Sequence, residues 1–294
     1  MNYEKNVCII RDYFRNYVKE NNIKSVVLGI SGGVDSALVA ALVSPVCNEL
    51  CIKLIGRSIP IGTNTQDEIE RAREFGELFC NDFEEVDQNI SLNVLNAFNE
   101  YLKPDTSIFK DKIRNGNTKA RIRMIILYDT AKKNNGLVLS SDNWTEFCLS
   151  FWSQHGDVGD LGLIQNICKT DVYGMARYLR DRLTDERFKK AFDRIINSVP
   201  TDGLGITSSD LEQIGAESYE EVDKILKTWL VTDIDSFVWD DHLKYDGRIE
   251  DYDEFVKYKE TLKDHPVVQR HINSEFKRNI PINIPIIDLD YKDH

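Results

Sequence analysis

A glycine pair followed by an aspartate is the clearest chemical signal in this sequence. The segment SGGVDS, Ser31–Ser36, places adjacent Gly32 and Gly33 directly after an apolar run, with the carboxylate of Asp35 two residues later. Glycines allow successive backbone N–H groups to point at one anion, and the N-terminus of a following helix also favours an anion. A carboxylate beside bound phosphate needs a divalent cation between them, and Mg²⁺ is the cation that proteins usually bind together with phosphates. The segment therefore predicts a phosphate site that uses Mg²⁺.

This segment differs from other phosphate-binding turns. A Walker A loop would place a lysine after its last glycine, and a dinucleotide-binding turn would space its glycines as GxGxxG. Neither pattern fits the residues at 29–36. The alternative is a turn of small residues with a solvated aspartate, and the strand and helix patterns on its two sides argue against that interpretation.

A second cluster of polar residues follows the apolar run Leu137–Ser141. Asp142 and Asn143 come next, and Glu146 is expected in the first turns of the following helix. Ligands bind at the carboxyl ends of the strands in such sheets, so Glu146 should face the same crevice as Asp35 and share one Mg²⁺ with it. A helix capping box explains the same residues, and both interpretations can hold together.

Two further segments carry charges that could do chemistry. The glycine-rich loop at 153–162 contains Asp157 and Asp160, which could simply make turns. The basic segment KARIRM at 119–124 is expected to open a long helix after a loop at 103–115. Basic residues at a helix N-terminus oppose the helix dipole unless an anion compensates, and a solvated basic face is the alternative.

The elements that must position these residues alternate along the chain. Apolar runs indicate strands at Val26–Ile30, Cys51–Ile59, Phe83–Val86 and Leu137–Ser141, with amphipathic helix patterns between them. This order predicts parallel strands joined by right-handed crossovers. The expected fold is α/β, a doubly wound parallel five-stranded sheet with helices on both faces, followed by a C-terminal helical extension.

Length and composition restrict the function further. The 294 residues are expected to form one domain over 1–230, with 231–294 as an extension that packs on the same domain. The net charge of −12 argues against nucleic acid as a partner, because that binding depends on clustered Lys and Arg. We find no signal-peptide pattern, no long apolar run and no CxxC pair among the six cysteines, so a soluble cytoplasmic protein with small-molecule partners and no membrane contact is expected.

Taken together, these motifs resemble those of one family. SGGVDS alone is similar to the pyrophosphate loop of the ATP pyrophosphatases. The full set follows the order and spacing of the ammonia-dependent NAD synthetases over about 24–226: SGGVDS, GN-x-KAR-x-RM, SSD-x₃-E, FWSQHGD, KT, PT and SYEEVD. The resemblance implies a homodimeric ligase that uses Mg²⁺ and converts deamido-NAD, ATP and ammonia to NAD, AMP and pyrophosphate through an adenylated carboxylate.

The resemblance also implies roles for individual residues. Asp35, Asp157 and Lys169 would carry the catalysis, with Asp157 nearest the ammonia. Asp35 and Glu146 would bind Mg²⁺. The implied ATP contacts are Gly29, Ser31, Gly32, Gly33, Val34, Asp35, Ser36, Ser141, Lys169 and Thr201, and the implied deamido-NAD contacts are Arg121, Gln154, Asp160 and Lys277.

The sequence departs from the family pattern at several positions. Gln154 and His155 stand where a lysine is usual, Ser141 replaces a threonine, Leu211 and Gln213 replace acidic residues, and Phe276 replaces a histidine. Two alternatives therefore stay open: a divergent ATP pyrophosphatase that adenylates another small carboxylate, and a nucleotide-binding regulator with the same fold. Too few residues precede SGGVDS for the amidotransferase domain of a GMP or asparagine synthetase, and a tRNA-modifying enzyme would need a basic surface.

Overall fold

The computed structural model describes residues 1–230 and 252–278, and its centre is a sheet of five parallel strands. The strands are β1 (Ser25–Gly29), β2 (Lys53–Ser58), β3 (Asp82–Glu85), β4 (Gly136–Ser140) and β5 (Leu161–Gly162), in the spatial order β3-β2-β1-β4-β5. β1 therefore pairs with β2 on one side and with β4 on the other. The direction of winding reverses between β1 and β4, and this reversal creates a crevice at the carboxyl ends of the two strands.

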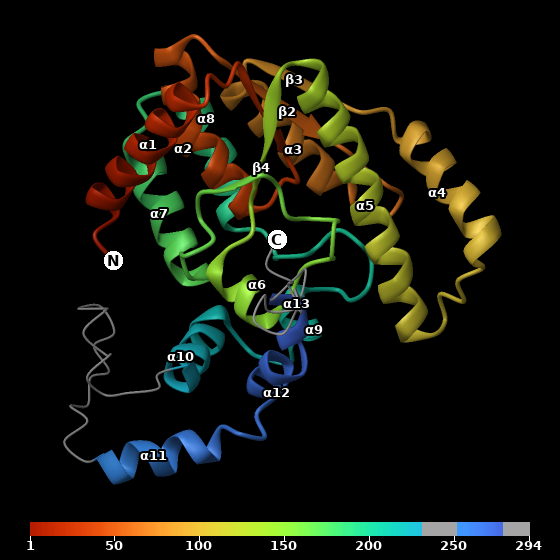
Figure 1. The fold of residues 1–294 in the computed structure, drawn as a ribbon, viewed down its shortest axis with the longest axis vertical. Helices are drawn as coiled ribbons and strands as arrows, with labels where there is room; N and C mark the ends of the chain where they lie inside the picture. Colours follow the sequence, from red (N-terminus) through yellow and green to blue (C-terminus); the bar gives the residue numbers. More distant parts are fainter. Residues whose placement is uncertain (231–251, 279–294) are drawn as a thin grey trace, which may run out of the picture.

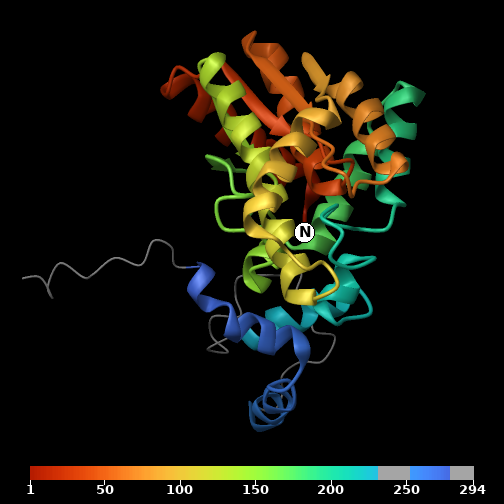
Figure 2. The ribbon, with the colours of Figure 1, turned by 90° about the vertical axis from the view of Figure 1, so that its right-hand side faces the viewer.

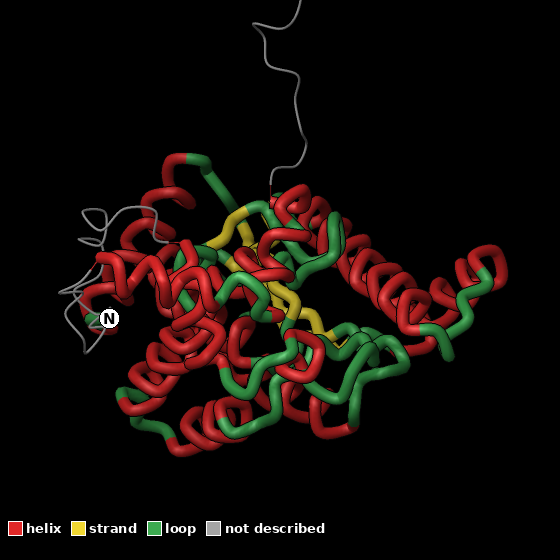
Figure 3. The backbone as a smooth tube through the Cα atoms, turned by 90° about the horizontal axis from the view of Figure 1, so that it is seen from below, coloured by secondary structure: helices red, strands yellow, loops and turns green. Residues whose placement is uncertain are grey.

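Helices connect the strands and lie on both sides of the row of strands (Figure 1, Figure 3). The first five are α1 (Tyr3–Glu20), α2 (Val34–Leu50), α3 (Gln66–Phe79), α4 (Gln88–Leu102) and α5 (Phe109–Lys133). After β4 come α6 (Trp144–Leu149), α7 (Lys169–Asp181), α8 (Glu186–Ile196), α9 (Asp210–Ile214) and α10 (Tyr219–Leu230). The last described helices are α11 (Tyr252–Thr261), α12 (Pro266–Asn273) and α13 (Glu275–Arg278).

The two faces of the sheet bury different side chains, because successive residues of a strand point to opposite sides. Val26 and Leu28 of β1 belong to the large core that includes α2 and α7, whereas Val27 lies in a smaller core with Met124 and Leu127 of α5. The three β1 side chains are at most 1% exposed. Burial on both faces explains the uninterrupted apolar run in this strand.

The expected α/β fold with a parallel five-stranded sheet is confirmed, and one detail, the start of α5, differs from the prediction. The fifth strand, β5, has two residues and no sequence pattern of its own. The loop expected at 103–115 was wrong in its second half, because α5 begins at Phe109 and the basic segment 119–124 lies inside this helix. Gly116 is buried in α5, and a Cβ atom there would lie 3.0 Å from Ile206 Cδ1. Close packing therefore explains this glycine.

The C-terminal helices lie below the sheet (Figure 2). α12 packs against α6, α9 and α10, and its Val267 and Val268 are fully buried there. The helical extension is confirmed over 252–278, whereas the expectations for 231–251 and 279–294 lie outside the described residues. The domain boundary near residue 230 stays a prediction. None of the helices within the described ranges is both long and apolar enough to cross a membrane.

Candidate active site

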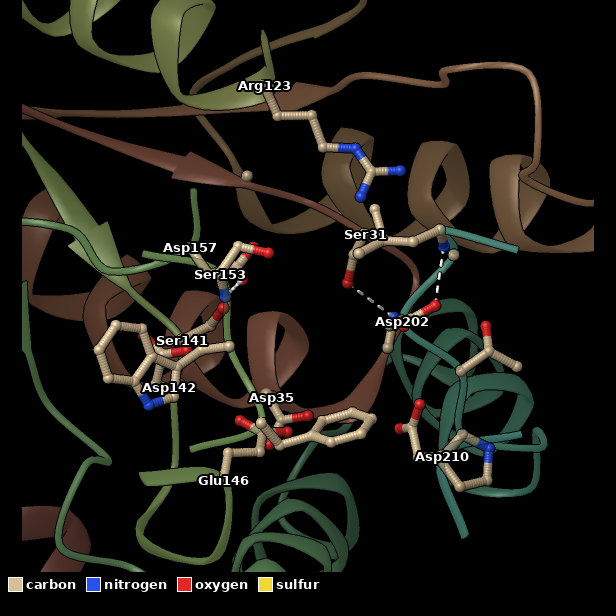
Figure 4. A pocket seen from close by; sticks show the side chains of 18 of the residues that line it. Ser31, Asp35, Arg123, Ser141, Asp142, Glu146, Ser153, Asp157, Asp202 and Asp210 are labelled. Atoms are coloured by element: carbon tan, nitrogen blue, oxygen red, sulfur yellow. Dashed lines mark hydrogen bonds between the residues drawn. The ribbon is translucent and has the colours of Figure 1, made fainter. Parts of the chain in front are cut away.

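A cavity of about 410 Å³ opens at the carboxyl ends of β1 and β4, where the winding reverses. It is lined by the loop after β1, by α5, by the start of α6 and by the segments 150–157 and 198–206 (Figure 4). Cavities of this size are typical of small-molecule sites. Seven Asp or Glu and six Lys or Arg residues line it, so its charges are nearly balanced.

The loop after β1 has the geometry that a phosphate site requires. Gly32 has a φ of +81°, and a Cβ atom there would lie 2.5 Å from the backbone oxygen of Glu68, so only glycine fits. Gly33 is the N-cap residue of α2, and no side chain caps this helix. The first N–H groups of α2 are therefore available to an anion. Ser36 supports the loop, because its Oγ donates to Gly33 O at 3.1 Å and lies 3.1 Å from Ser31 Oγ.

Three charged side chains converge beside this loop. Lys169 Nζ donates to Asp35 Oδ2 at 2.5 Å and to Glu146 Oε1 at 3.1 Å. Asn143 Nδ2 donates to the other carboxylate oxygen of Asp35 at 2.9 Å. Asn143 and Glu146 also form the capping box of α6, so Glu146 caps its helix and contacts Lys169 at the same time. The two carboxylates expected at neighbouring strand ends thus meet at one cation.

Burial and charge determine the protonation of this cluster. Burial lowers the pKa of Lys169, but the carboxylates of Asp35 and Glu146 outweigh that effect and raise the pKa well above its usual value. Burial also raises the pKa of Glu146, and the Lys169 ammonium opposes this rise. Lys169 is only 2% exposed. Lys169 is therefore protonated at neutral pH and pairs with two acidic side chains.

The same carboxylates fit a magnesium ion. Mg²⁺ is usually held by one or two carboxylates together with substrate phosphates and water. Asp35 and Glu146 already point at one cation beside the uncapped start of α2. Within residues 1–230 and 252–278, no group of three or more His, Cys, Asp or Glu side chains is arranged to hold a metal. The carboxylates of Asp35 and Glu146 thus suit a metal ion that also binds phosphate oxygens better than an ion bound by protein groups alone.

Residues distant in the sequence hold the main chain of Lys169. Its N–H donates to Thr145 Oγ1 at 2.9 Å, and Thr145 in turn donates to Asp223 on α10. Asp223 also accepts from the N–H and the Oγ1 of Thr170, at 2.9 and 2.7 Å. Thr145 and Asp223 are 0% and 3% exposed. The motif SYEEVD at 218–223 therefore fixes the start of α7.

Asp142 and Asp157 form another acidic part of the cavity (Figure 4). Asp142 accepts from Ser140 Oγ at 2.6 Å, and Asp157 accepts from the N–H of Ser153 at 2.5 Å. Burial raises the pKa of Asp142 to about 6, and the nearby Asp157 carboxylate adds to the rise. Burial also raises the pKa of Asp157. Carboxyls of this kind are candidates for proton transfer near neutral pH.

The basic segment KARIRM contains two residues that hold loops and one that is exposed. Lys119 Nζ donates to Leu204 O at 3.0 Å, and Arg123 Nη2 donates to Asn64 Oδ1 at 3.0 Å. Protein oxygens therefore compensate these two cations. The segment lies inside α5 and not at its N-terminus, so the expected conflict between basic residues and the helix dipole does not arise. Arg121 is exposed, and its Nε donates to a backbone oxygen at 3.0 Å.

The structure brings most of the expected site residues to this cavity. Its lining includes Gly29, Ser31, Gly32, Gly33, Val34, Asp35, Ser141, Glu146, Asp157, Lys169, Thr201 and Lys277. Four others do not line it: Ser36, Arg121, Gln154 and Asp160. Asp160 instead accepts from the N–H of Val138 at 2.9 Å and from the hydroxyl of Tyr128 at 3.0 Å. Gln154 provides the backbone oxygen that Arg121 contacts.

Several charged residues of the lining carried no clear sequence signal, among them Arg71, Asp202, Asp210 and Arg270. Burial raises the pKa of Asp210 to about 6, and its Oδ2 accepts from the hydroxyl of Tyr219 at 3.2 Å. Arg270 reaches the site from α12 and donates to Leu149 O at 3.2 Å. The serine cap before Asp210 marks a helix start in the sequence, but it does not reveal burial. The position of these residues in the cavity depends on tertiary packing, which no local sequence pattern predicts.

Comparison with known proteins connects this site to a family. The NAD synthase family model matches residues 6–281. The NH(3)-dependent NAD(+) synthetase of Methanococcus aeolicus is 35% identical over 236 residues, which cover 77% of this chain and 83% of that protein. The protein of the same name from Finegoldia magna is 34% identical over 227 residues, covering 77% of this chain and 85% of the relative.

Solved structures share the fold over nearly the whole chain. The NMN synthetase from Francisella tularensis matches with a TM-score of 0.70 at 20% identity, covering 97% of this chain and 99% of that one. The NH3-dependent NAD synthetase from Campylobacter jejuni matches with a TM-score of 0.65 at 23% identity, covering 97% and 100%. At these identities the structures show the fold, whereas the family model and the curated relatives carry the assignment. On that evidence, the chain belongs to the NAD synthase family.

Proposed function

We propose that this chain forms NAD by amidating deamido-NAD, with free ammonia as the nitrogen donor. ATP is converted to AMP and pyrophosphate in the reaction. The observation that carries the proposal is the cluster of Asp35, Glu146 and Lys169 beside the uncapped N-terminus of α2, in a chain of the NAD synthase family. The names of the curated relatives, NH(3)-dependent NAD(+) synthetases, support ammonia as the donor.

The first step joins the nicotinate carboxylate to AMP. The N–H groups at the start of α2 and the ammonium of Lys169 bind the ATP phosphates, while Ser141 and Thr201 contact the nucleotide from the same cavity. Asp35 and Glu146 would hold Mg²⁺, which neutralises charge on the phosphates. A carboxylate oxygen attacks the α-phosphorus, and the bond from that phosphorus to the leaving pyrophosphate breaks.

The second step places the nitrogen. Ammonium must lose a proton before it can attack the adenylated carbonyl carbon, and AMP then leaves with the electrons of the broken C–O bond. Asp157 lines the cavity, and burial raises its pKa, so its carboxylate can attract the ammonium cation and accept the proton. We assign Asp157 as the general base on these grounds.

The proposed assembly is a cytoplasmic homodimer. The six cysteines are free thiols, which fits a reducing compartment. On α5, Ile125 and Tyr128 are 61% and 41% exposed and lie on the same helix face as Arg121. We propose that this face lies in a twofold interface and borders the bound dinucleotide. The residues that contact the dinucleotide would be Arg121, Gln154, Asp160 and Lys277. Lys277 donates to Ser150 O at 2.8 Å and to Trp152 O, which leaves a third N–H of its ammonium for the substrate.

Pyrophosphate release from the purified chain tests the function. We expect release to require ATP, Mg²⁺ and deamido-NAD together, and NAD to form only when ammonium is added. At a fixed total ammonium concentration the rate should rise with pH, because free ammonia is the nucleophile. Nicotinate mononucleotide is tested in parallel, since a fold neighbour is an NMN synthetase. NAD formation with glutamine as the only nitrogen donor, or release with another carboxylate and not with deamido-NAD, would contradict the proposal.

A further inference from the structure

The ammonium of Lys169 stands at the point where the two acidic side chains of the cluster converge. It lies 2.5 Å from Asp35 Oδ2 and 3.1 Å from Glu146 Oε1. The Lys169 side chain is 3% exposed, and both carboxylates are 17% exposed. Solvent therefore screens these charges little, and the lysine is the partner that balances them.

A metal ion and this ammonium compete for the same oxygens. Mg²⁺ binds carboxylate oxygens at about 2.1 Å, which is closer than the ammonium stands to either of them. Two cations at one pair of oxygens repel each other strongly in a buried site. The other two oxygens, Asp35 Oδ1 and Glu146 Oε2, accept hydrogen bonds from Asn143, so a metal that binds both carboxylates displaces the Lys169 ammonium.

We propose that Lys169 is the counter-cation of Asp35 and Glu146 in the nucleotide-free protein, and that it yields this position to the metal only when bound phosphates provide another partner for its ammonium. The inference rests on the proposed function in one respect, which is that ATP binds at the loop after β1. Binding of nucleotide and binding of metal are then coupled through one side chain, and the coupling acts equally in both directions.

The surroundings of Lys169 suit such a movement. Its main chain is fixed, because the N–H donates to the buried Thr145 and the next residue, Thr170, is held by Asp223. The ammonium lies 5.3 Å from the centre of the Tyr219 ring and contacts the cavity that the loop after β1 also lines. The side chain can therefore change its direction while α7 stays in place. Without an anion in the cavity, a displaced ammonium would lose both of its carboxylate partners.

Binding of Mn²⁺ to the nucleotide-free protein tests this inference without any measurement of activity. Free Mn²⁺ is measured by its electron paramagnetic resonance signal at about pH 9, because burial raises the pKa of Glu146 to about 8. We expect the wild type to bind Mn²⁺ weakly, and Lys169→Gln to bind it about tenfold more tightly or better, because the competing charge is gone. Lys277→Gln is the matched control: it also removes a partly buried cation from the cavity lining, but Lys277 contacts backbone oxygens and not these carboxylates. It should bind Mn²⁺ as the wild type does.

Three results would overturn the inference. The first is a folded Lys169→Gln protein whose Mn²⁺ affinity equals or falls below that of the wild type. The second is an equal gain of affinity in Lys277→Gln, which would indicate a general charge effect. The third needs no variant, so it decides the question even if Lys169→Gln does not fold: tight Mn²⁺ binding by the wild type without nucleotide. Since none of these measurements uses deamido-NAD or ammonia, failure here is distinct from failure of the proposed reaction.

Discussion

Removing the hydroxyl of Thr145 tests how the start of α7 is held. This residue is fully buried and connects two segments: its Oγ1 accepts from the N–H of Lys169 at 2.9 Å and donates to Asp223. Thr145→Val keeps the size and branching of the side chain and removes both hydrogen bonds. Thr145→Ser keeps the hydroxyl and removes only a methyl group, so it is the matched control.

The expected loss can be worked out from these contacts. A buried N–H left without an acceptor costs about 1–3 kcal/mol, and a hydrogen bond to a carboxylate contributes about 1.5–3 kcal/mol. The added methyl group of valine offsets about 1 kcal/mol of this. Thr145→Val should therefore lower the free energy of unfolding by about 1.5–5 kcal/mol. Thr145→Ser should lower it by about 1 kcal/mol.

Urea unfolding and pyrophosphate release measure the two consequences. We expect Thr145→Val to lower kcat by up to about a hundredfold, because the main chain that carries Lys169 is no longer fixed. Thr145→Ser should stay close to the wild-type rate. If the valine variant loses no more stability than the serine variant, the hydroxyl does not hold α7. If it loses stability but keeps its kcat, Thr145 has no part in positioning Lys169.

Four further variants test other parts of the site. Asp35→Asn should lower pyrophosphate release by about a hundredfold or more with an unchanged circular dichroism spectrum, and a rate within about tenfold of wild type would contradict its role. Burial raises the pKa of Asp210 to about 6, so the wild type loses stability as the pH rises from the unfolded value of about 3.9 through 6, whereas Asp210→Asn does not. The stability of this variant relative to wild type should therefore improve by up to about 3 kcal/mol between about pH 4 and pH 7, and an equal difference at both pH values would refute the argument. Gln154→Lys should tighten deamido-NAD binding about tenfold in calorimetry and leave ATP binding unchanged, unless the pocket is built for a neutral partner, in which case affinity falls. Ile125→Asp should convert a dimer to a monomer in light scattering, and an unchanged mass would place the interface elsewhere.

The conformation of the loop after β1 and the sheet could be predicted because their information is local. The run SVVLG is buried on both faces, so its apolar pattern is continuous, and Gly32 has a conformation that only glycine adopts without strain. Both signals lie within a few residues of the feature they report. Reliance on local information also caused the error at the start of α5. Gly116 is a local signal for a loop, but the residue lies inside the helix, where its missing side chain makes room for residues 204 and 206.

The cluster around Lys169 is the opposite case. Lys169 lies 134 residues from Asp35, and Thr145 lies 78 residues from Asp223. No periodicity connects such residues. Glu146 was expected from its place after a strand end, whereas only the resemblance to a family brought Lys169 to attention. Asp210 and Arg270 belong to no quoted motif, and their contribution became visible only when packing was known. Contacts of this kind depend on which strand ends meet, which is a property of the whole chain.

The hydrogen bonds from α12 and α13 to the end of α6 also determine the order in which parts of the structure can form during synthesis. Arg270 donates to Leu149 O across 121 residues of sequence, and Lys277 donates to Ser150 O across 127. Ribosomes add about 5–20 residues each second, so the segment that leads to Asp157 is synthesised on the order of ten seconds before the helices that hold it. All five strands emerge well before α12. A growing chain can therefore assemble its sheet and the loop after β1 early, and the segment that leads to Asp157 gains its contacts with α12 and α13 only after the last described helix has been made.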